Sequence, residues 1–171
     1  MDILKKNFFE LFDVDVAVDL NKFELDQTAK LLQSQFHPDK YINSTDFEKR
    51  LALQISSHIN DGHKTLGDIV SRVEYILKIN NFNKDESKTI NDINFLQEQI
   101  EYSELIEEMK NSPDNALIEK SLLDVNKLLK QIIAKIKKSL NNSDFEEMWI
   151  NFSKLRFYMN NVNELLEIKK I

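Results

Sequence analysis

The chain has 171 residues, with only two glycines, two prolines and no cysteine. So few helix breakers predict long helices with short connections, and the lack of cysteine excludes disulfides, thiolate metal sites and cysteine nucleophiles. The formal net charge of −6 argues against a broad nucleic-acid or anionic-membrane surface, and no stretch approaches the roughly 18 consecutive apolar residues of a membrane span. We therefore expect an all-α, cytoplasmic protein without a metal or another cofactor.

Capping patterns predict where the first helices begin. Asn7 and Glu10 have the spacing of a capping box and begin a short helix, and Asn21 with Glu24 repeats that spacing at the start of a second helix. The apolar face of the short helix consists of Phe8, Leu11 and Phe12. The second helix carries apolar residues at intervals of three and four, namely Leu25, Ala29, Leu32 and Phe36.

The second helix is predicted to end at the segment Gln35-Phe36-His37-Pro38-Asp39-Lys40. Pro38 removes a backbone donor and disfavours the helical conformation at the preceding residue, His37. His37 and Asp39 are therefore expected at the surface, in a loop. A His-Pro-Asp tripeptide is also a common turn composition, so the tripeptide alone does not indicate a function.

A third helix is predicted to begin at Thr45, which forms a capping box with Glu48. Its apolar stripe consists of Phe47, Leu51, Ile55, His58, Ile59, Gly62 and Leu66. Gly67 is expected to close this helix as a C-terminal glycine, and Asp68 or Ser71 to cap a fourth helix that includes 71–77.

Two histidines lie in the predicted third helix. His58 is on the apolar stripe, and we expect it to be a core histidine because no second ligand stands at metal spacing from it. His63 is on a different face and is expected to be exposed to solvent.

The His-Pro-Asp loop thus lies between two amphipathic helices of about 15 and about 20 residues, lengths that place it at the tip of an antiparallel pair. This arrangement resembles the J-domain of DnaJ-type co-chaperones, in which a His-Pro-Asp loop joins the two long helices. More of the chain is similar to the HscB family, the J-domain co-chaperones of iron-sulfur cluster assembly, through Ile59-Asn60, Leu66, 72–77, 93–101 and 154–157. The absence of a Cys-rich zinc segment favours the bacterial type.

The domain organisation follows from one polar stretch and three long helical patterns. We predict one domain at 1–79, a linker at 80–88 and a three-helix domain at 89–171. The HscB resemblance implies that the first is the J-domain and that the second binds the scaffold protein on which iron-sulfur clusters are assembled. The first helix of that domain is expected from about Ile90 to Met109. Ser112-Pro113 is expected to start the next helix and Ser143 the last. The apolar stripes of these two helices are Leu122, Val125, Leu129, Ile132, Ile136 and Leu140 in one, and Met148, Phe152, Leu155, Met159, Val162 and Leu166 in the other.

Helical geometry separates a core stripe from a surface strip in the helix that starts near residue 90. Phe95, Tyr102, Ile106 and Met109 form the core stripe, and Leu96 and Ile100 lie about 100–140° away from it. The surface strip therefore begins apolar and becomes acidic; its other members are Gln97, Glu101, Glu104 and Glu108. On the last helix, Phe157 is predicted opposite the core stripe. Isolated apolar residues beside a solvated charged face are the ordinary interpretation, whereas the HscB resemblance favours a protein-binding patch.

The resemblance implies two partners. His37, Pro38 and Asp39, with the cationic Lys30 and Lys40, are expected to bind a DnaK/HscA-type chaperone and stimulate its ATPase. The patch formed by Leu96, Gln97, Ile100, Glu101, Glu104, Glu108 and Phe157 is expected to bind the IscU-type iron-sulfur scaffold. Because one compact bundle can bury the apolar stripes, we expect a monomer.

Three alternatives remain open from the sequence. A general J-domain co-chaperone for other protein clients would need a broad apolar or Met-rich groove, and none is evident. A hydrolase using His37 and Asp39 as acid and base would lack a nucleophile, metal ligands and a phosphate loop. In a simple helical interaction protein, the His-Pro-Asp loop would be incidental.

Overall fold

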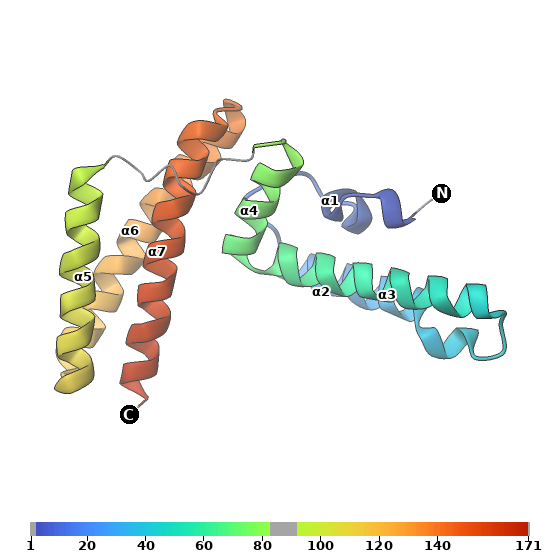
Figure 1. Cartoon of the computed structure of the whole chain (residues 1–171), viewed down its shortest axis with the longest axis horizontal. Coiled ribbons are helices and arrows are strands. Elements are labelled where there is room, and N and C mark those ends of the chain that lie inside the picture. The colour runs from blue at the N-terminus through green and yellow to red at the C-terminus, as the bar shows by residue number, and fades with distance from the viewer. Residues whose placement is uncertain (1–2, 83–91, 171) are drawn as a thin grey trace. The chain divides into compact units, whose positions relative to one another are not determined.

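The computed structural model describes residues 3–82 and 92–170, and all regular elements within these ranges are helical (Figure 1). The chain divides into two compact units, 1–81 and 82–171, which are described separately below. The predicted all-α architecture, an N-terminal unit with an antiparallel helix pair followed by a three-helix bundle, is confirmed. Most of the predicted linker, 80–88, lies outside the described residues, so the predicted domain boundaries stay predictions.

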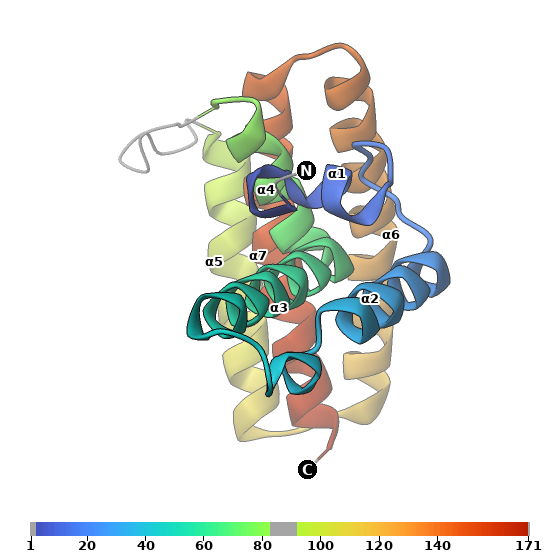
Figure 2. The ribbon, with the colours of Figure 1, turned by 90° about the vertical axis from the view of Figure 1, so that its right-hand side faces the viewer.

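The first unit is organised around a pair of antiparallel helices. It contains the elements η1 (Ile3–Lys5), α1 (Phe8–Phe12), α2 (Lys22–Phe36), η2 (Pro38–Tyr41), α3 (Asp46–Gly67) and α4 (Ile69–Ile79). Helices α2 and α3 pack against each other, and Figure 2 shows the short turn η2 joining them at one end of the pair. The other helices of this unit pack on α3 at and beyond its middle, so that the turn is left at the free tip.

Most of the predicted caps of the first unit are present. Asn7 and Thr45 both form complete capping boxes, and Asn21 caps α2 by accepting a hydrogen bond from the backbone N–H of Phe23. Asp68 caps α4. The predicted glycine cap is wrong, because Gly67 is the last residue of α3 and does not have a positive φ.

The core of the first unit lies between α1, α2, α3 and α4. Its buried apolar residues are Phe9, Leu11, Phe12, Val18, Leu25, Ala29, Ala52, Ile55, Ile59, Leu66, Val73, Ile76 and Leu77. The prediction that Phe47 belongs to the buried stripe is wrong, since its side chain is 67% exposed. The line through Ala52, Ile55 and Ile59 sets the buried face of α3, and Phe47 is about 100° from the centre of that face.

The two histidines of α3 both have partners. His58 is half-buried, with Nε2 3.2 Å from the backbone oxygen of Lys6 and its ring against Phe8. His63, predicted to be exposed, has a side chain that is 37% exposed, and its Nε2 lies 2.7 Å from Asp26 Oδ1 on α2. This hydrogen bond is the main cause of a lowered pKa at the Asp26 carboxyl. The contact ties α2 to α3.

The second unit is a three-helix bundle of α5 (Ile93–Asn111), α6 (Asn115–Asn141) and α7 (Phe145–Lys169). Its three N-caps are aspartates, at 92, 114 and 144. Two predicted starts are therefore wrong. Ser112 belongs to the end of α5, where its N–H bonds to the carbonyl of Glu108, and Ser143 has a φ of 55°, whereas a capping residue is typically extended.

Helix α7 is the centre of this bundle, because both α5 and α6 pack against it. Ile106, Met109, Ile118, Leu165 and Ile168 form a core cluster where the three helices meet. Contact with both α5 and α6 buries a face of α7 wider than one stripe, so Tyr158, Leu165 and Ile168 are buried in place of the predicted Met159, Val162 and Leu166. The chain's single tryptophan, Trp149, is half-buried in the same helix. No helix among the described residues is long and apolar enough to cross a membrane.

Candidate functional sites

The His-Pro-Asp segment forms a defined turn with outward-facing side chains. His37 is extended (φ −62°, ψ 129°) and ends α2, and Pro38 occupies the start of η2, where a missing backbone N–H costs nothing. The backbone N–H of Asp39 donates to Nδ1 of His37 at 3.3 Å, and that of Lys40 donates to the His37 carbonyl at 3.0 Å. The side chains of His37 and Asp39 are 56% and 79% exposed. With Nδ1 accepting, the neutral imidazole carries its proton on Nε2, which is available to a partner.

Two exposed lysines and two exposed apolar side chains lie near this turn. Lys30, two helical turns before His37, and Lys40 are both exposed. Sequence reasoning missed two exposed apolar side chains at the same tip, Ile42 just after η2 and Phe47 in the first turn of α3. Ile42 could have been recognised from the sequence, because it is an apolar residue in the largely polar segment that connects α2 to α3.

The strip predicted on α5 is exposed along its length. Leu96 and Ile100, one turn apart, are each 53% exposed. The polar members of the strip, Gln97, Glu101, Glu104 and Glu108, are exposed as well. The amide of Gln97 donates to the carboxylate of Glu101 at 2.9 Å, which orders the middle of the strip. The geometry is therefore that of an apolar pair continued by an acidic edge.

The predicted exposure of Phe157, opposite the core of α7, is wrong. Its side chain is half-buried and its ring packs edge-on against Phe95 at 5.6 Å and Tyr102 at 6.4 Å, both from α5. A helical wheel drawn from the sequence assumes one core stripe on α7 and places Phe157 outside it. In the structure, α5 covers a second side of α7 and so covers Phe157. Phe157 and Leu96 consequently line the same cleft between α5 and α7, of about 320 Å³. The cleft is completed by Phe95, Gln99, Ser153, Arg156 and Asn160.

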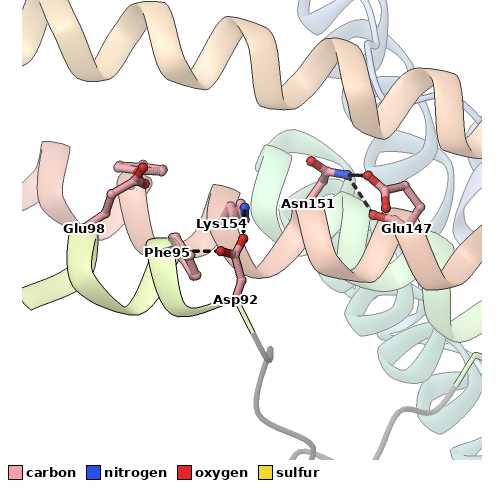
Figure 3. Close-up of polar contacts among 7 residues, drawn as sticks. Asp92, Phe95, Glu98, Glu147, Asn151 and Lys154 are labelled. Atoms are coloured by element: carbon pink, nitrogen blue, oxygen red, sulfur yellow. Dashed lines mark hydrogen bonds and ion pairs between the residues drawn. The ribbon is translucent and has the colours of Figure 1, made fainter.

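Polar contacts hold α5 in place on α7 (Figure 3). Asp92 caps α5 through the backbone N–H of Phe95 and also pairs with Lys154, whose Nζ lies 2.7 Å from the carboxylate and 5.0 Å from the Phe95 ring centroid. The hydrogen bond from Lys154 is the main cause of a lowered pKa at the Asp92 carboxyl. The hydroxyl of Tyr158 donates to Glu98 at 2.6 Å, and burial raises the pKa of that hydroxyl. These contacts fix the spacing of the two walls of the cleft.

No cluster of His, Cys, Asp and Glu suited to a metal ion occurs within 3–82 and 92–170. Both exposed surfaces place apolar side chains beside charged ones, a composition typical of protein-binding surfaces.

The sequence and the fold match known proteins along nearly their whole length. A family model described as "HSCB C-terminal oligomerisation domain" matches residues 91–166. The co-chaperone protein HscB homolog of Shewanella amazonensis is 35% identical over 144 residues, 83% of either chain. The homolog from Vibrio vulnificus is 32% identical over 161 residues, 93% of this chain and 94% of its own.

Two solved structures have the same fold. The chaperone HscB from Vibrio cholerae matches with a TM-score of 0.86 and 28% identity, covering 96% of this chain and 98% of its own. Human co-chaperone protein HscB matches with a TM-score of 0.86 and 25% identity, covering 98% of this chain and 83% of its own.

The fold and the exposed His-Pro-Asp turn define a co-chaperone built from a J-domain and a C-terminal three-helix bundle. Within that class, the chain belongs to the HscB family, as its motifs indicated.

Proposed function

We propose that this protein is a cytoplasmic co-chaperone that stimulates ATP hydrolysis by a DnaK/HscA-type chaperone and delivers an IscU-type scaffold to it during iron-sulfur cluster assembly and transfer. The observation that carries the proposal is that one chain presents two exposed recognition surfaces, each on its own compact unit.

The turn at the tip of α2 and α3 is suited to the chaperone. The carboxylate of Asp39 has one oxygen 3.5 Å from Nδ1 of His37 and is 79% exposed, so it can accept a charge-assisted hydrogen bond from an arginine of the partner, and the imidazole of His37 offers a donor beside it. Lys30 and Lys40 supply positive charge that steers an acidic surface to this tip. Pro38 holds the two side chains in position before binding, so that little ordering entropy is lost.

The face of α5 and α7 is suited to the scaffold. Leu96 and Ile100 are exposed apolar anchors, Phe157 forms one wall of the adjoining cleft, and Glu101 begins an acidic edge that complements a basic partner. Linking the two surfaces in one chain raises the effective concentration of scaffold at the chaperone without any new contact. Binding of either partner then promotes the next step of the chaperone's nucleotide cycle.

We expect the co-chaperone to act as a monomer, since the bundle buries its own apolar stripes. The description of the matched family model names oligomerisation, so the expectation needs its own measurement. Sedimentation velocity at several protein concentrations distinguishes a constant monomer mass from a mass that rises with concentration.

The experiment that tests the proposal is steady-state ATP hydrolysis by the chaperone, with and without this protein and with and without the scaffold. Stimulation should increase when scaffold is present and should be lost in His37→Gln, while scaffold binding by His37→Gln stays unchanged. Stimulation that ignores the scaffold would keep a general J-domain co-chaperone and reject the iron-sulfur role. No stimulation by the folded wild-type protein would reject the proposal.

A further inference from the structure

The cleft between α5 and α7 has two unlike walls. Leu96 on the α5 side and Phe157 at the α7 side are apolar, so the middle of the cleft suits a single apolar side chain. Ser153, Arg156 and Asn160 give the α7 lip a polar character that the strip on α5 does not share. A segment lying across the cleft would therefore meet different chemistry on its two sides.

Arg156 carries a positive charge on that lip. Its side chain is exposed and has no carboxylate within ion-pair distance in the described parts of the chain. Lys154, two residues earlier, is in contrast occupied by Asp92. The Arg156 guanidinium lies 5.9 Å from the ring centroid of Phe152, a cation–π distance that restricts its orientation.

The charge of α5 is opposite. This helix carries five glutamates and a single lysine, Lys110, which pairs with Glu164. The cleft thus separates an acidic helix face from the guanidinium of Arg156. Such an arrangement distinguishes the two directions in which a docked segment can lie, because reversing the segment would place like charges together on both sides.

We propose that Arg156 is a specificity-determining residue of the scaffold surface and binds a carboxylate of the scaffold. The bound segment places an apolar side chain in the cleft against Leu96 and Phe157, its carboxylate on Arg156, and basic side chains toward the acidic edge of α5. A guanidinium binds a carboxylate through two parallel hydrogen bonds, which gives direction as well as attraction. This inference rests on the proposed function, since it takes the scaffold to be the protein that docks on α5 and α7.

The test is calorimetric titration of the full-length protein with the IscU-type scaffold. Arg156→Glu should weaken binding about tenfold or more, and Arg156→Lys, which keeps the charge without the paired hydrogen bonds, should lie between it and wild type. Lys130→Glu is the matched control, because Lys130 is an exposed lysine on α6 outside the cleft and its replacement changes the net charge equally. We expect wild-type affinity for this control.

A charge-reversal rescue gives a readout that loss of structure would not produce. Replacing each acidic residue of the scaffold in turn by lysine should identify one variant that binds Arg156→Glu more tightly than it binds wild type. ATPase stimulation measured without scaffold should be unchanged in Arg156→Glu, because the proposed chaperone site lies in the other unit.

The outcomes separate the inference from the function on which it rests. Failure of the wild-type protein to bind scaffold would reject the proposed function. Normal wild-type binding, lost in Leu96→Ala but kept in Arg156→Glu, would overturn the role of Arg156 alone. Equal weakening by Arg156→Glu and Lys130→Glu would show a general charge effect and would also overturn it.

Discussion

The two recognition surfaces are built in different ways. The His37–Asp39 turn consists of adjacent residues whose arrangement is fixed by a proline and a hydrogen bond within the turn. The cleft on the second unit joins Leu96 to Phe157, residues far apart in the sequence that meet only because α5 packs on α7. A surface of the first kind depends on local backbone chemistry, and one of the second kind depends on tertiary packing.

The largest contrast is expected between Leu96→Ala and Phe157→Ala. Both should weaken scaffold binding at least about tenfold, as truncation of interface anchors does. Phe157→Ala should also lower the free energy of unfolding by about 2–3 kcal/mol because its ring packs on Phe95, while Leu96→Ala should change it by less than about 0.5 kcal/mol. Urea unfolding and calorimetric titration measure the two effects. Equal destabilisation by both variants would contradict the assignment of Leu96 to the surface.

In the His37–Asp39 turn, Pro38→Ala should disturb the arrangement of the side chains without lowering the stability of the folded protein. Alanine restores the backbone donor and allows α2 to continue past His37, so the side chains lose their fixed arrangement. We expect ATPase stimulation to fall about tenfold, which corresponds to about 1.4 kcal/mol of lost preorganisation. Scaffold affinity and the unfolding midpoint should stay near the wild-type values. A large drop in the unfolding midpoint would show that the turn is not locally determined.

An effect of similar size is expected at one of the two glycines of α3, and almost none at the other. A Cβ on Gly62 would lie 2.8 Å from Cε2 of Phe12 and 3.0 Å from Cδ1 of Phe8, whereas a Cβ on Gly67 would meet nothing within 4 Å. Gly62→Ala should therefore destabilise the first unit by about 1–2 kcal/mol, the cost of overpacking offset in part by helix propensity. Gly67→Ala should be neutral or slightly stabilising. Thermal unfolding measures both changes, and a stabilised Gly62→Ala would contradict the close packing of α1 on α3.

The smallest effect concerns the ion pair that holds the start of α5. Because the pKa of Asp92 is lowered in the folded state, its ionised form stabilises the protein above the ordinary carboxyl pKa of 3.8, and this stabilisation is lost as the pH falls through the folded-state pKa. Asp92→Asn keeps a capping side chain but loses the charge. Its unfolding temperature should be below that of wild type at pH 7, and the difference should shrink below pH 4. A difference independent of pH would assign the effect to the cap alone.

Sequence reasoning succeeded where structure is encoded locally. The capping boxes at Asn7 and Thr45 located two helix starts correctly, and Pro38 located the end of α2. The same reasoning placed Ser143 one residue too early at the start of α7, because several polar residues there can cap and only the backbone conformation selects among them.

The errors that affect the second site have a tertiary cause. A helical wheel divides each helix into one buried stripe and one exposed face, but α7 has a neighbour on two sides. The wheel therefore placed Phe157 at the surface and gave no indication that Arg156 borders a cleft. The partner of His63 was missed for a related reason, since Asp26 lies on another helix and no local pattern connects the two.

The position of Trp149 has a spectroscopic consequence. It is the chain's single tryptophan and lies on α7 in the second unit. Tryptophan emission excited near the red edge of protein absorbance therefore reports on the second unit, while far-ultraviolet circular dichroism reports on the helices of both. Recording the two signals during one denaturant titration resolves whether the units unfold together, because coincident transitions indicate a single cooperative unit and separated transitions indicate two.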